Sequence, residues 1–180
     1  MKQLTAITLF FFIAVTTTAQ TKPAKDSSLG FPQAFAGKWK GTLTWFTADK
    51  PAKTFVMRLN ILPADSGHFT WQIIYGDDLN DNRPYTLKQV DAAKGHWIVD
   101  ENNSIILDSY WIGNRFTGVF SVNHSTILDQ YWIAEDGLHV EFIAYETAAA
   151  SVSGGTSNDI PPVSSYKIKS IQRGVLTRVN

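Results

Sequence analysis

The sequence contains no cysteine, so neither a disulfide bond nor a lipid-modified cysteine can hold or anchor the protein. It also has no excess of charge, because 16 basic side chains balance 16 acidic ones. This balance excludes the strongly basic surface with which proteins bind nucleic acid or anionic membranes. Beyond the N-terminus, no apolar run reaches the ~20 residues that a membrane-spanning helix needs. We therefore expect a soluble protein with neither a nucleic-acid partner nor a membrane span.

The N-terminus has the composition of a secretory signal peptide. A basic residue is followed by an apolar run from Leu4 to Val15 and by small residues that suit cleavage after Ala19. We predict a signal peptide over 1–19, a flexible leader over 20–34 and a single domain over 35–180. Export without disulfides favours a periplasmic or secreted protein.

Apolar and polar residues alternate with a period of two from residue 35 onward. Trp39, Leu43 and Trp45 fall on one face of the first such segment, and the same alternation recurs over 55–61 and 69–75. Turn-forming residues separate about ten segments of this kind, with no long helical pattern between them. This pattern predicts an up-and-down antiparallel β-barrel of about 8–10 strands, with a two-sheet β-sandwich as the alternative.

The last two predicted strands, over 138–145 and 165–175, flank a stretch rich in Ser, Gly and Pro. This stretch, over 148–163, has the composition of a long mobile loop.

The phrase Ile-Leu-Asp-x-Tyr-Trp-Ile occurs twice, at 106–112 and at 127–133. With two-residue hairpin turns at Gly113-Asn114 and Asn123-His124, the even-numbered positions of the phrase face inward in the first copy and the odd-numbered positions face inward in the second. A third turn, at Asp136-Gly137, gives the second copy the same facing. We therefore predict that Asp129 and Tyr131 point into the barrel while Asp108 points outward; an odd-length loop would reverse the result.

A catalytic pair of carboxylates is the first enzymatic hypothesis for this repeat. A glycosidase needs two acids about 5 to 9.5 Å apart on one side of a cleft. Because Asp108 and Asp129 are predicted two strands apart and on opposite faces of the wall, the sequence argues against this pairing. We expect no catalytic residue from it.

The predicted inner wall defines a candidate ligand site. Asp129, Tyr131 and Ser109 form a polar patch on an otherwise apolar wall, and a buried polar group needs a hydrogen-bond partner, which a ligand could supply. The alternative is that Arg58, Arg173 or water satisfies Asp129. The candidate ligand-binding residues are Trp45, Met57, Trp71, Ser109, Phe116, Phe120, Asp129 and Tyr131.

Metal binding is not predicted. The four histidines, at 68, 96, 124 and 139, lack metal-ligand spacing. The segment 77–82 alternates acidic and amide residues as a calcium loop does, but Arg83 stands where the loop needs glycine.

Apolar residues of the central strands also fall on the outer face. They predict a partner surface or a homodimer, unless another part of the chain covers them. These residues are Tyr110, Ile112, Leu128, Trp132, Ile143 and Tyr145.

The segment 35–41, Phe-Ala-Gly-Lys-Trp-Lys-Gly, opens the first strand with Gly-x-Trp and resembles the start of the calycin superfamily of lipocalins, fatty-acid-binding proteins and nitrobindin-like proteins. The resemblance implies that Gly37 and Trp39 are structural, with Arg173 or Arg178 packing on the tryptophan. Nitrobindin-like proteins hold haem through a histidine late in the barrel. Because no histidine follows His139, we expect no haem and no other cofactor.

Three functions remain open at this point. The first is an exported, lipocalin-like protein that binds a small hydrophobic ligand inside the barrel. The second is an interaction or dimerising protein with a filled core. The third is a hydrolase or isomerase that uses Asp129 as acid or base in the cavity.

Overall fold

The computed structural model describes residues 30–180, so the predicted signal peptide and residues 20–29 of the predicted leader lie outside the described residues. The chain forms ten antiparallel strands that close into a barrel, each strand pairing with its neighbours in sequence and β1 pairing with β10. The up-and-down barrel predicted from the sequence is confirmed. The strands are β1 (Gly37–Thr47), β2 (Lys50–Ile61), β3 (Phe69–Tyr75), β4 (Asp81–Asp91), β5 (His96–Asp100), β6 (Ile106–Ile112), β7 (Arg115–Val122), β8 (Ser125–Ala134), β9 (Gly137–Ser153) and β10 (Val163–Val179), with short 3-10 helices η1 (Gln33–Phe35) and η2 (Asp65–Gly67).

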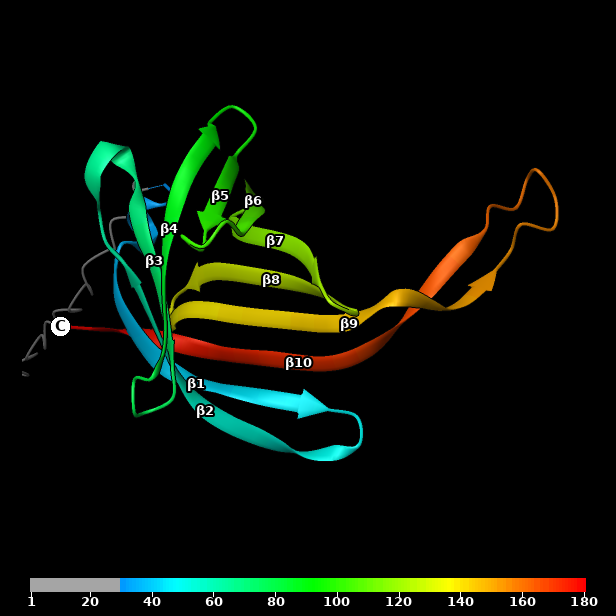
Figure 1. Ribbon diagram of the computed structural model, residues 1–180, viewed down its shortest axis with the longest axis horizontal. Helices are drawn as coiled ribbons and strands as arrows, with labels where there is room; N and C mark the ends of the chain where they lie inside the picture. Colours follow the sequence, from blue (N-terminus) through cyan, green and yellow to red (C-terminus); the bar gives the residue numbers. More distant parts are fainter. Residues whose placement is uncertain (1–29) are drawn as a thin grey trace, which may run out of the picture.

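Closure of the barrel follows from the period-two pattern, because every strand has one apolar face to bury. Leu43 of β1, Met57 of β2 and Trp71 of β3 point inward, and each is at most 1% exposed. A closed sheet also leaves no unpaired edge within the barrel. Figure 1 shows β3 to β5 crossing steeply over the direction of β8 to β10, the strong strand tilt that a barrel requires.

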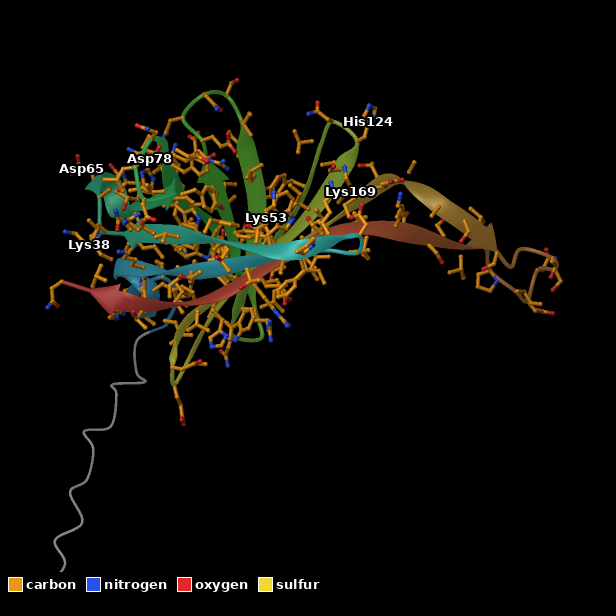
Figure 2. The ribbon with its side chains drawn as sticks, turned by 90° about the horizontal axis from the view of Figure 1, so that it is seen from below. Lys38, Lys53, Asp65, Asp78, His124 and Lys169 are labelled. Atoms are coloured by element: carbon orange, nitrogen blue, oxygen red, sulfur yellow. The ribbon has the colours of Figure 1, made fainter. Side chains whose placement is uncertain are left out.

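The predicted mobile loop over 148–163 is wrong in its bounds. Strand β9 continues to Ser153 and β10 begins at Val163, and the two remain paired as a two-stranded ribbon. Figure 1 shows this ribbon projecting from one end of the barrel as an arm, and Figure 2 shows His124 and Lys169 beside its root. Small and hydroxylic side chains suit a strand pair with two solvated faces, so composition alone did not distinguish the arm from a loop.

The register of the central hairpins decides which residues face inward. Gly113-Asn114 and Asn123-His124 are the two-residue turns predicted, and they place Gly118 opposite Asp129. The third turn is wrong by one position, since Ala134 pairs with Gly137 and the turn residues are therefore 135 and 136. The resulting β8–β9 register differs from the prediction by two residues, an even number, so every side chain keeps its predicted face.

The segment before β1 closes one end of the barrel. Phe31 stacks on Trp111 and Phe116, with ring centroids 5.0 and 4.6 Å apart, and meets Phe35 and Trp97 edge-on, each at 5.1 Å. Residues 30–34, predicted as the end of a flexible leader, therefore pack against the barrel instead. We call this the closed end.

Trp39 lies at the closed end and is 1% exposed. Its indole N–H donates to the carbonyl of Phe35 at 2.8 Å, and the guanidinium of Arg178 lies 4.3 Å from its ring centroid. Arg178 also donates to the carbonyls of Ala34 and Ala36, which ties the last strand to the segment before the first. This is the arrangement that the Gly-x-Trp resemblance implies.

Of the two arginines that the resemblance allows as the structural partner of this tryptophan, Arg178 is the one that lies on it, and Arg173 is wrong. Arg173 pairs with Thr44 on the outer face of the wall, and its guanidinium lies over the ring of Phe46 at 5.3 Å. Gly37, the other predicted structural residue, has a φ of 145°, and a Cβ there would come within 2.4 Å of the Arg178 guanidinium. A glycine at this position therefore makes room for the arginine.

Candidate functional site

A cavity of about 890 Å³ occupies the half of the barrel away from the closed end. This size lies within the range of small-molecule sites in proteins. Aromatic and aliphatic side chains form most of its wall, and polar groups gather at one level of the interior and around the opening. Its lining includes Trp45, Phe55, Trp71, Tyr75, Tyr85, Leu107, Phe120, Ile127, Tyr131 and Phe142.

Six of the eight predicted ligand residues line this cavity: Trp45, Trp71, Ser109, Phe120, Asp129 and Tyr131. The other two, Met57 and Phe116, point inward but lie buried in the core and are not part of the lining. Phe116 packs edge-on against Trp71, with ring centroids 5.1 Å apart, so it belongs to the packed layer beneath the cavity.

Asp129 belongs to a continuous inward-facing row that crosses four strands. Ser109 on β6 pairs with Gly118 on β7, Gly118 with Asp129 on β8, and Asp129 with Phe142 on β9. A Cβ on Gly118 would lie 2.4 Å from Asp129 Oδ1 and 2.9 Å from Ser109 Oγ. The Asp129 carboxylate thus occupies the space that a side chain at position 118 would fill.

Burial governs the chemistry of Asp129. Removal of its carboxyl group from water raises its pKa to about 6, against a partial opposing effect of nearby backbone N–H groups. Its Oδ1 is buried and has no hydrogen-bond partner among residues 30–180. A buried acceptor without a donor is energetically unfavourable, and such groups are concentrated at functional sites.

The two arginines proposed from the sequence as partners of Asp129 are engaged elsewhere. Arg58 donates to the carbonyl of Gly76 at 2.8 Å and lies 3.9 Å from Asp77. Arg173 lies on the outer face, over Phe46. Neither arginine accounts for the carboxylate inside the barrel.

Charged residues of β4 line the cavity near its opening. Arg83 makes two hydrogen bonds to Asp81, from Nε at 2.8 Å and from Nη2 at 2.9 Å, and its guanidinium lies 4.8 Å from the centre of the Tyr75 ring. Burial raises the pKa of Tyr75 to about 12, although Arg83 opposes the rise. Burial also raises the pKa of Tyr85, and Glu101, which lines the same region, raises it further.

These charged residues at the opening were not among the predicted site residues. The alternation predicts a strand over 85–90 only, because the Asp- and Asn-rich segment 76–82 has the composition of a turn, whereas β4 begins at Asp81 and includes Arg83. The alternation Asp81, Arg83, Tyr85, Leu87 was the available signal, since Leu87 is fully buried and fixes the inward face.

In the other copy of the repeat the aspartate faces outward, as predicted. The side chain of Asp108 is 66% exposed and its Oδ1 lies 2.6 Å from His96 Nε2. Asp108 and Asp129 therefore lie on opposite sides of the wall and do not form a catalytic pair. In the part of the chain that the structure describes, no three His, Cys, Asp or Glu side chains gather as metal ligands would.

The predicted apolar outer band is only partly exposed. Ile112 is 67% and Tyr110 40% exposed. Trp132 is partly covered, since Arg115 lies 4.0 Å from its ring centre and His139 stacks on it at 5.0 Å. Among the described helices, none is long and apolar enough to cross a membrane.

No protein-family model matches the sequence, and no curated protein matches it. Among solved structures, the fold is similar to that of a DUF3598-family protein of unknown function from Nostoc punctiforme PCC 73102, with a TM-score of 0.59 and 12% identity. The similarity covers 82% of this chain and 48% of the other, so this chain spans about half the length of that protein. At this identity the similarity shows the fold alone. The calycin resemblance stays a prediction, because no family model matches.

Proposed function

We propose that the protein is an exported carrier that holds one small, mostly apolar molecule inside its barrel. The observation that carries this proposal is the combination of a largely apolar cavity of about 890 Å³ with a buried acceptor, Asp129 Oδ1, that residues 30–180 leave unpaired. Apolar walls supply affinity, and a single polar group orients the ligand. The signal-like N-terminus supports the exported location.

Native mass spectrometry of protein purified from its own host tests the carrier function. We expect a bound small molecule that is released on denaturation. A neutral dye, Nile red, should also bind the emptied protein and gain fluorescence in the apolar cavity. Ala144→Trp, which adds a large side chain to the cavity lining, should abolish both signals. A wild-type protein that carries nothing and does not bind Nile red would refute the proposal.

Acid–base catalysis inside the cavity is the second candidate. It is favoured by the pKa of about 6 of Asp129, which places the carboxyl group where it can both give and take a proton near neutral pH. When host extract is incubated with the protein, mass spectrometry should then show the loss of a small molecule from the extract. The loss should stop with Asp129→Asn; equal loss with both proteins would exclude Asp129 as the acid or base.

A further inference from the structure

We propose that the cavity is selective for amines, and that a ligand ammonium group on an apolar body pairs with the carboxylate of Asp129. This inference rests on the proposed carrier function and specifies its ligand class. Three independent features of the cavity support it: the free acceptor, the charge of the lining and the aromatic rings around the carboxylate.

The first feature is the unpaired acceptor. Among residues 30–180 no group donates a hydrogen bond to Asp129 Oδ1, and the adjacent Gly118 contributes no side chain that could do so. An ammonium group both donates hydrogen bonds and neutralises the charge, whereas a hydroxyl group only donates. A ligand carboxylate would add a second negative charge beside the first, which is unfavourable in a desolvated site.

The second feature is the charge of the lining. Three acidic residues, Asp81, Glu101 and Asp129, line the cavity in the described part of the chain, against one basic residue, Arg83. Arg83 is already held by two hydrogen bonds to Asp81. A concave site with an excess of one charge attracts ligands of the opposite charge, so the cavity favours cations over anions.

The third feature is the aromatic surroundings of the carboxylate. Phe142 lies directly opposite Asp129 across the strand pair, and Tyr131 follows two residues later on the same inward face. Trp71 meets Tyr131 edge-on, with ring centroids 5.0 Å apart. Aromatic faces attract ammonium groups, and they do so most strongly when the cation has lost its water.

Isothermal titration calorimetry with three ligands of equal chain length tests the inference. n-Octylamine, n-octanol and n-octanoate are titrated into the emptied protein at pH 8, where Asp129 is ionised and the amine is still charged. We expect n-octylamine to bind at least about tenfold more tightly than n-octanol, and n-octanoate to bind most weakly. This ranking on the wild-type protein needs no variant, so it decides the question even if a substitution disturbs folding.

Substitution then assigns the preference to one carboxylate. Asp129→Asn should lower the affinity for n-octylamine at least about tenfold while changing that for n-octanol less than about threefold. Asp108→Asn, the matched change in the outward copy of the repeat, should alter neither affinity.

The outcomes separate this inference from the carrier function on which it rests. Binding of n-octanol or n-octanoate as tightly as n-octylamine would overturn the amine preference and leave the carrier function standing. Nile red binding without binding of any octyl ligand would do the same. Failure of every ligand, Nile red included, would overturn both.

Discussion

Replacement of Asp129 by asparagine should stabilise the protein at neutral pH. The carboxyl group is buried in the cavity wall, and its pKa rises from an ordinary value of 3.8 to about 6 in the folded state. A raised carboxyl pKa means that the folded protein binds the proton more tightly than the unfolded chain does. The free energy of unfolding therefore falls as the pH rises from about 4 to about 6, and the cost is complete above about pH 7.

The magnitude follows from the two pKa values. Each pH unit between them is worth about 1.4 kcal/mol, so ionised Asp129 costs about 3 kcal/mol at neutral pH. Asparagine has nearly the same shape and no charge to desolvate, but its amide also needs partners, so we expect a net gain of about 2 kcal/mol. For a domain of this size the gain corresponds to roughly 4 to 8 °C in Tm.

Urea denaturation of wild-type and Asp129→Asn protein at pH 4, 5, 6, 7 and 8 measures this effect. The difference in unfolding free energy should grow from pH 4 to pH 6 and stay constant above pH 7. Four other carboxylates, Asp81, Asp91, Asp100 and Asp136, have lowered pKa values and produce the opposite slope. Both proteins contain these four, so the difference isolates Asp129.

Asp108→Asn is the control, because this carboxylate is exposed and occupies the same place in the other copy of the repeat. Its effect should stay below about 1 kcal/mol. The groups that surround Asp129 introduce no competing titration: Gly118 and Phe142 are uncharged, and the pKa values of Tyr75 and Tyr131 lie far above this range. A wild-type minus Asp129→Asn difference that does not change between pH 4 and 7 would refute the reasoning.

Four further substitutions test the packing of the barrel by thermal and urea unfolding. Gly118→Ala should destabilise the protein by about 1–3 kcal/mol and weaken Nile red binding, because its Cβ would occupy the place of the Asp129 carboxylate; full stability with unchanged binding would contradict the geometry. Met57→Ala should cost about 2–5 kcal/mol because this fully buried side chain belongs to the core, and a cost below about 1 kcal/mol would show that it does not. Arg178→Ala should cost about 1–3 kcal/mol through its lost contacts at the closed end, while Arg173→Ala should stay within about 0.5 kcal/mol; equal costs would argue against the assigned roles.

Local pattern was sufficient to predict the inward position of Asp129. A strand has a side-chain period of two and a two-residue turn preserves parity, so facing can be counted through successive hairpins. The β8–β9 turn shows how tolerant this counting is, because an even error in register leaves every face unchanged. The same counting could have excluded Arg173 as a partner of Asp129 or Trp39. Arg173 lies an odd number of residues from the buried Leu176 on the same strand and so faces outward.

The pairing of β1 with β10 could not be predicted by counting through hairpins, because no hairpin turn joins these two strands. It places Trp39 opposite Arg178, although the two residues stand at opposite ends of the chain. Residues 30–34 were predicted as the end of a flexible leader, yet Phe31 packs against four aromatic rings at the closed end. Contacts of this kind exist only after the barrel has closed, and no local pattern reports them.

By itself, the sequence determined the all-β class, the alternation of faces and the opposite directions of the two aspartates in the repeat, because these depend on neighbours along the chain. The tertiary structure alone decided that the barrel closes with ten strands, that inward side chains leave a cavity, and that Asp129 Oδ1 in its wall has no partner in the described chain. Barrel diameter and the depth of each ring are properties of all strands together. The presence of a cavity therefore depends on how all the strands close together, and it cannot be predicted from the pattern of any single strand.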